Sequence, residues 1–215
     1  MGVSAFGNLS YFGVIRVPTL SWGALAPGLL VILVSGLLGG LFARLLTASL
    51  TGLSPDRFTA WRKRFPVRFA AAGGLAVAVI GLVSDGTTFG SGSETVQHML
   101  AGHADVPTLY VMLKFMATWL TAWTGVPGGI FAPSLSIGAG IGHDIAALLG
   151  MNGAGGISPA LIAMGMAGFL AAVTQAPLTS FIIVMEMVDG HAMVLSLMAA
   201  AMPVSYTHLT LPTKA

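Results

Sequence analysis

Long apolar segments alternate with short polar segments along this chain of 215 residues. Residues 26–51 contain a single charged residue, Arg44, and residues 67–84 contain only Arg68. About 20 predominantly apolar residues are enough for a helix to cross the hydrocarbon core of a bilayer. The pattern therefore predicts two full-length membrane-spanning helices at these positions.

The later apolar segments are shorter and are interrupted by glycine and proline. They predict helices over residues 107–124, 133–150 and 158–176, then one helix after Pro177 and a last helix from residue 191. Broken helices at membrane depth are tolerated where they are buried in protein or line a polar cavity. In transporters they are typical of the ion or substrate site, so we expect a site in this part of the chain.

Two helix starts have their own signals. Residues 85–105 are too polar to span a membrane and predict a loop followed by a short helix, with Ser93 as the N-cap and Glu94 in the first turn. Ser158 followed by Pro159 predicts an N-cap and a first helical residue.

Composition favours an integral membrane protein. The chain is 55% hydrophobic and 7% charged, with a mean hydropathy of +0.89, whereas soluble domains carry about a quarter charged residues. The 29 glycines follow no fixed period, which argues against a low-complexity polymer. The chain has no cysteine, so nothing supports thiol-based metal or redox chemistry.

The positive charge is concentrated where the first predicted span gives way to the second. Residues 52–69 hold five of the nine basic residues: Arg57, Arg62, Lys63, Arg64 and Arg68. Short loops rich in lysine and arginine stay on the cytoplasmic side of a membrane. A nucleic-acid patch is the alternative, but it is disfavoured in a short loop between two membrane helices, and we expect no nucleic-acid partner.

The stretch GVPGGIFAP, residues 125–133, combines three glycines, two prolines and no charge. Its glycines allow a close backbone approach, and Ile130 and Phe131 are apolar, so any polar chemistry must come from backbone amides. Amides at a helix N-terminus bind anions without a full positive charge, which suits an ion that must also be released. An anion pathway is therefore favoured over a cation pathway, for which Asp144 is the nearest acid downstream.

Several other residues have a chemical and a structural interpretation. SIGAGIG, residues 136–142, resembles a dinucleotide loop, but no strand precedes it, so tight helix packing is favoured. His98 with His103, or His143 with Asp144, match no standard metal spacing. We therefore expect no metal site.

Three charged residues on or beside apolar helices remain. Lys114 is expected to be snorkelling or paired rather than transporting. Glu186 and Asp189 flank the end of an apolar helix, where a capping or packing role is favoured over transport. No serine, histidine and carboxylate arrangement indicates catalysis, so the chain is not expected to be an enzyme or to hold a cofactor.

Three separate motifs resemble one known family. Gly129-Ile-Phe-Ala-Pro133 matches the G-x-F-x-P motif of the CLC family of chloride channels and chloride/proton antiporters. TTFGSGSE at 87–94 is similar to the family's glycine-rich segment, and MAGFLAAVTQAPLTSFIIVMEM at 166–187 resembles its late helix pair. The motifs occur in the family's order, and the resemblance covers about residues 10–203.

The resemblance implies an all-α, polytopic membrane bundle of tilted and broken helices built from inverted repeats, working as a homodimer. Gly129, Ile130 and Phe131 would bind chloride, and Gly128 and Pro133 would shape the pathway. The family moves chloride as a channel or in exchange for protons. We expect the membrane to be a bacterial inner membrane.

The resemblance also implies that the chain is the second half of a CLC protein. The family's gating-glutamate loop and its pore tyrosine are not found here, and Met1 is expected to be an internal methionine. Residues 1–203 would form the transport domain. Residues 204–215, VSYTHLTLPTKA, resemble an adaptor sequence translated in frame and are predicted to be a non-native tail, with a genuine polar tail as the alternative.

Two other functional classes stay open at this point. One is a different inverted-repeat carrier with similar glycine-rich breaks, for example for sugars or amino acids. The other is a membrane scaffold or inactive half-protein that transports nothing.

Overall fold

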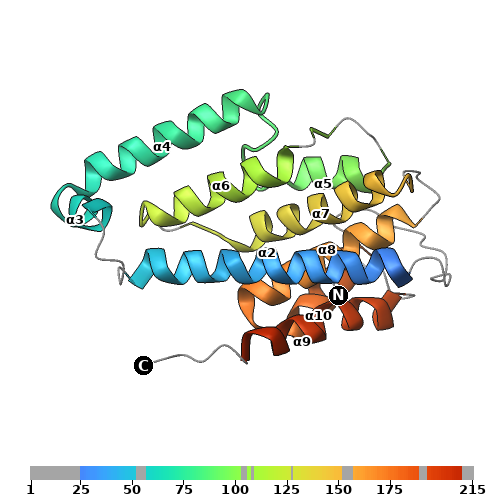
Figure 1. Ribbon diagram of the computed structural model, residues 1–215. Coiled ribbons are helices and arrows are strands. Elements are labelled where there is room, and N and C mark those ends of the chain that lie inside the picture. Colours follow the sequence, from blue (N-terminus) through green and yellow to red (C-terminus); the bar gives the residue numbers. More distant parts are fainter. Residues whose placement is uncertain are drawn as a thin grey trace, which may run out of the picture.

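The computed structural model describes residues 25–51, 57–102, 106–107, 109–126, 128–151, 157–188 and 193–209. These residues form nine α-helices and no strand (Figure 1), which confirms the predicted all-α fold. In chain order the helices are α2 (Leu25–Thr51), α3 (Arg57–Arg64), α4 (Pro66–Val83), α5 (Ser93–Leu100), α6 (Tyr110–Trp123), α7 (Phe131–Leu148), α8 (Ser158–Thr174), α9 (Pro177–Met187) and α10 (Val194–Leu209).

Helix α8 forms the centre of the bundle. Every residue from Ser158 to Ala172 is buried, and α8 packs against α7, α2, α10 and α9. A helix that is apolar on all sides is stable only when protein or lipid surrounds it. In this fold α2 crosses one side of α8, while α9 and α10 lie on the side away from α7 (Figure 1).

Glycines bring α7 and α8 into backbone contact. A Cβ atom on Gly138 would lie 2.5 Å from the carbonyl oxygen of Gly165, and a Cβ atom on Gly142 would collide with the carbonyl group of Leu161. Small residues four apart allow two membrane helices to approach this closely. The SIGAGIG segment therefore acts in helix packing, as predicted.

The two predicted spans form helices of sufficient length. Residues Leu25–Ser49 and Pro66–Val83 are long and apolar enough to cross a membrane, with mean hydropathies of 2.3 and 1.9. Helix α4 lies at the edge of the bundle and projects beyond α6 (Figure 1). Only Phe69 and Gly81 are buried along it, so most of its apolar surface is left for contact with lipid or another chain.

The basic segment between the spans is helical, where the sequence predicted a loop. Arg57–Arg64 form α3, and the chain changes direction at Phe65, whose φ and ψ are −138° and 68°. Proline disfavours the helical conformation in the residue before it and is well tolerated in the first turn of a helix. Pro66 therefore ends α3 and begins α4.

The predicted N-caps are each displaced by one residue. Gly92, with φ 82°, precedes α5 and Ser93 is its first residue; Glu94 lies in the first turn as expected. A Cβ atom at Gly92 would lie 2.8 Å from the Tyr110 hydroxyl oxygen, so both the backbone angle and the crowding favour glycine there. Ile157 occupies the N-cap of α8, and Ser158 is its first residue.

Helix α10 runs through residue 204 to Leu209, with Pro203 inside it. Residues 1–24 and 210–215 lie outside the described residues, whereas the predicted boundary at residues 203 and 204 lies inside α10. The division into a transport domain at 1–203 and a non-native tail stays a prediction.

Candidate functional site

The GIFAP segment leads directly into the first turn of α7. Gly128, Gly129 and Ile130 have no regular secondary structure, and α7 begins at Phe131 with Ile130 as its N-cap. The first α-helical hydrogen bond is donated by the Ser134 amide to the Ile130 carbonyl oxygen, at 3.0 Å.

The amides at this end of α7 are therefore available to a ligand. The first backbone N–H groups of a helix have no acceptor within it, so the Phe131 and Ala132 amides are not used by α7. Pro133 has no N–H group. These amides lie at the positive end of the dipole of an 18-residue helix.

A cavity of about 290 Å³ opens beside this helix start. Four predicted residues line it: Gly128, Gly129, Ile130 and Pro133. Phe131, the fifth, is not among the lining residues, and 40% of it is exposed. The remaining wall comes mainly from α6 and from the turn before α5, with Thr88, Gly90, Lys114, Thr118, Thr121 and Val126 among its members.

Lys114 is the cation of this cavity wall. It is 2% exposed, and its Nζ atom donates hydrogen bonds to the carbonyl oxygens of Thr88, at 2.8 Å, and Gly90, at 2.9 Å. Lys114 is therefore paired, as expected, and its partners are backbone carbonyl groups of the glycine-rich turn. The sequence pattern alone does not place Lys114 beside Ile130. The signal that points to it is a lone cation within an apolar helix.

A pair of buried hydroxyl groups lies on the other side of the α7 start. The Tyr110 hydroxyl of α6 and the Ser136 hydroxyl of α7 are hydrogen-bonded to each other and buried. A small cavity of about 60 Å³ there is lined by Ser91, Ser93, Ala132 and Ser136, among others. The first turn of α7 is thus flanked by two cavities, and the sequence analysis missed this pair because its members are 26 residues apart.

The remaining candidates in the described part of the chain do not assemble into a site. His143 Nδ1 lies 3.4 Å from the Asp144 carboxylate of the next residue, and within the described residues no three histidine, cysteine or acidic side chains could hold a metal. Glu186 is exposed near the end of α9. His103 and Asp189 lie outside the described part of the chain.

Comparison with known proteins identifies the family. A family model described as "Voltage gated chloride channel" matches residues 1–208. The chain belongs to the voltage-gated chloride channel, or CLC, family. The resemblance inferred from the GIFAP, TTFGSGSE and late-helix motifs is therefore confirmed.

Named relatives and a solved structure agree with this CLC assignment. The "Voltage-gated ClC-type chloride channel ClcB" of Salmonella typhimurium is 32% identical over 83% of this chain and 42% of the relative. The "H(+)/Cl(-) exchange transporter ClcA" of Vibrio vulnificus is 29% identical over 77% of this chain and 37% of the relative. The crystal structure of a CLC-type fluoride/proton antiporter shares the fold, with a TM-score of 0.72 at 20% identity, over 91% of this chain and 47% of that one.

Membership of the CLC family also bears on two of the sequence-based predictions. Proteins of this family are channels or transporters, so the prediction that the chain is not an enzyme is confirmed, as is the prediction of an integral membrane protein. The chain spans less than half the length of the curated relatives it matches.

Proposed function

We propose that this chain contributes the GIFAP side of a chloride pathway in a CLC-type channel or chloride/proton antiporter. The observation that carries the proposal is the cavity of about 290 Å³ lined by both Ile130 and Lys114. Family membership supports anion transport in general, and we assign the transported ion to this cavity because it lies beside the α7 start.

The electrostatics of the cavity favour an anion. Its described lining contains one cation, Lys114, and no carboxylate. The dipole of α7 adds partial positive charge at Phe131. Because the Lys114 ammonium is already bound to two carbonyl oxygens, it raises the local potential without closing tightly on the ion, which suits binding followed by release.

Each predicted residue has a role in this proposal. The amides of Ile130 and Phe131 donate to chloride, and Gly129 lets the backbone approach the ion. Gly128 and Pro133 shape the wall of the cavity, which both residues line. Ala132 also has a first-turn amide, but it lines the smaller cavity of about 60 Å³ on the other side of the helix start.

The wider setting of the proposal follows the family. Protons would be the second ion in the exchanger case, as the name of the Vibrio vulnificus relative states for that protein. We propose that the complete protein is a homodimer in a bacterial inner membrane. The basic segment from Arg57 to Arg68 would lie on the cytoplasmic side.

The test removes one amide without changing the side chain. Proline at 131 would strain Ile130, whose φ and ψ of −96° and −12° are disfavoured before proline. Phenyllactic acid introduced at position 131 instead replaces the amide N–H by an ester oxygen. Chloride binding to the purified chain is measured by isothermal titration calorimetry, with fluoride titrated in parallel to compare the two halides.

A matched control uses the helix start of α9. Leu178 is the second residue of that helix and is 56% exposed, so an ester there also removes a first-turn amide, away from the cavity. A hydrogen bond to a charged group contributes about 1.5–3 kcal/mol, so the ester at 131 should weaken chloride binding about 10- to 100-fold, with no change at 178. Equal affinities for all three proteins would overturn the proposal and favour a scaffold or inactive half-protein.

A further inference from the structure

The segment that joins the two candidate spans, residues 50–65, carries an excess of positive charge, with four basic residues and one acid, Asp56. From Arg57 to Val83 the sequence contains five basic residues and no aspartate or glutamate. Arg62 is engaged inside the protein, because its Nη1 atom donates to the carbonyl oxygens of Ser49, at 2.8 Å, and Trp123, at 3.1 Å. Arg64 and Arg68 are exposed instead.

These two arginines converge on one aromatic ring. The Cζ atom of Arg64 lies 5.4 Å from the centre of the Phe65 ring, and the Cζ atom of Arg68 lies 5.1 Å from it. Cation–π attraction holds each guanidinium group against the ring. Neither guanidinium has a carboxylate partner in the described part of the chain, so two like charges are gathered at one exposed place and an anion would relieve their repulsion.

An aromatic cluster fixes this patch to the bundle. Phe69 lies edge-on to Trp61, with ring centres 5.3 Å apart, and to Trp123 of α6, at 5.2 Å. Trp123 is stacked in turn on Trp119, with ring centres 5.5 Å apart. Helix α3 and the start of α4, which carry Arg64 and Arg68, are therefore anchored on α6.

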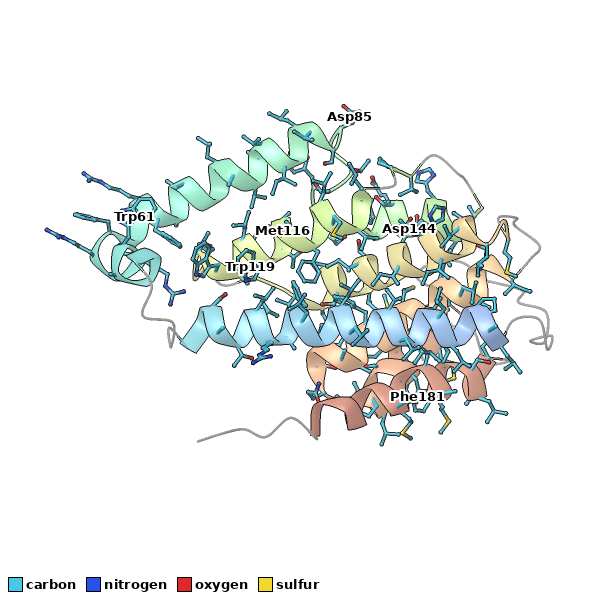
Figure 2. All side chains as sticks on the ribbon, viewed as in Figure 1. Trp61, Asp85, Met116, Trp119, Asp144 and Phe181 are labelled. Carbon is cyan, nitrogen blue, oxygen red and sulfur yellow. The ribbon has the colours of Figure 1, made fainter. Side chains whose placement is uncertain are left out.

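The patch lies at the end of a candidate membrane span. The apolar span of α4 begins at Pro66, next to Phe65, and the span of α2 ends at Ser49, the residue whose carbonyl oxygen binds Arg62. Trp61 is 40% exposed and lies among outward-pointing basic side chains at one end of α4, whereas Asp85 lies at the other end (Figure 2). Tryptophan and arginine together at the end of a span are typical of the membrane–water interface.

We propose that Arg64, Phe65 and Arg68 form a binding site for the phosphate group of an anionic phospholipid. Guanidinium groups bind phosphate by charge-assisted hydrogen bonds, and basic residues beside a span attract anionic headgroups. The half-exposed Trp61 would contact the glycerol and upper acyl region of the same lipid. The site is separate from the cavity at Ile130, and the lipid would hold the α3–α4 corner in the headgroup layer.

The test is native mass spectrometry of the full chain in detergent, titrated with phosphatidylglycerol or phosphatidylcholine. Each basic residue near an anionic surface contributes about a factor of five, so R64Q/R68Q should bind phosphatidylglycerol about 30-fold more weakly. The single variant R68Q should show part of this loss. R44Q, which removes an exposed arginine from α2, should bind as the wild type does.

Two further measurements make the outcome decisive. Melting temperatures in lipid-free detergent should be the same for all variants, because the substituted side chains are exposed. Added phosphatidylglycerol should raise the melting temperature of the wild type and of R44Q, but not the melting temperature of R64Q/R68Q. Equal binding of the two lipids by the wild type, or an equal loss in R44Q and R68Q, would overturn the proposal. Displacement of the lipid by millimolar inorganic phosphate would assign the patch to soluble anions and overturn it as well.

Discussion

Lys114 and Thr88 are joined by a hydrogen bond of 2.8 Å between the lysine ammonium group and the threonine carbonyl oxygen. This bond connects the middle of α6 to the glycine-rich turn before α5, 26 residues earlier in the chain. It places a charge on the wall of the cavity beside Ile130 and ties the turn to α6 at the same time.

Replacing this lysine should therefore loosen the turn. In K114M the carbonyl groups of Thr88, which is buried, and Gly90, which is exposed, lose their donor, and an unsatisfied buried acceptor such as that of Thr88 costs about 1–3 kcal/mol. We expect faster backbone hydrogen exchange across residues 84–92 and a lower melting temperature of the purified chain. Exchange mass spectrometry in detergent measures the first effect directly.

Thr118 provides the control for K114M. It lies one turn further along α6 and lines the same cavity, but its hydroxyl donates only to the Lys114 carbonyl oxygen of its own helix, at 2.8 Å. T118V should leave exchange across residues 84–92 unchanged. If hydrogen exchange across residues 84–92 were as slow in K114M as in the wild type, the structural role assigned to the lysine would be contradicted.

The backbone contact between α7 and α8 predicts a strong dependence on side-chain size at Gly138. A methyl group there would meet the Gly165 carbonyl oxygen at 2.5 Å, and overpacking of this kind costs about 1–3 kcal/mol. We expect G138A to lower the melting temperature of the chain in detergent. Tryptophan fluorescence measures this melting temperature.

Gly74 gives a matched comparison for that substitution. It lies in the interior of α4, and a Cβ atom there would meet nothing within 4 Å. Alanine is favoured over glycine in a helix by up to about 1 kcal/mol, so G74A should leave the melting temperature unchanged or raise it. Similar behaviour of the two variants would show that the contact between α7 and α8 is not tight.

The buried pair of Tyr110 and Ser136 should behave as one coupled unit. Y110F leaves the Ser136 hydroxyl without this partner, and S136A leaves the Tyr110 hydroxyl with Thr95 as its remaining hydrogen-bond neighbour. An unsatisfied buried hydroxyl costs about 1–3 kcal/mol. The double variant removes both hydroxyls, so its loss of stability should be smaller than the sum of the single losses, by about 0.5–3 kcal/mol. Denaturant unfolding of the four proteins in mixed micelles gives this coupling energy, and additive losses would argue against the hydrogen bond.

Much of the fold was predictable from the sequence because the relevant signals are local. Uninterrupted apolar runs predicted α2 and α4, and the proline and glycine breaks predicted where α7, α8 and α9 begin to within a few residues. The GIFAP motif similarly predicted the family, which the comparisons confirmed. Its assignment to chloride remains a proposal.

The α3 helix shows where local signals were insufficient. Its high positive charge predicted a loop, yet aromatic contacts of Trp61 and the bonds from Arg62 to the ends of α2 and α6 favour a helix there. These partners come from segments distant in the chain, and their contribution cannot be read from the charge pattern. The same contacts position Arg64 and Arg68 beside Phe65.

The sequence by itself determined which segments are apolar enough to cross a membrane, where proline and glycine interrupt them, and which family the chain belongs to. These properties depend on each residue and its near neighbours. Only the tertiary structure decided that Lys114 is bound by Thr88 and Gly90 beside the GIFAP cavity, and that Tyr110 meets Ser136. Those pairings depend on how helices far apart in the chain pack around α7 and α8, where a buried polar group must find whichever partner the packing brings within reach.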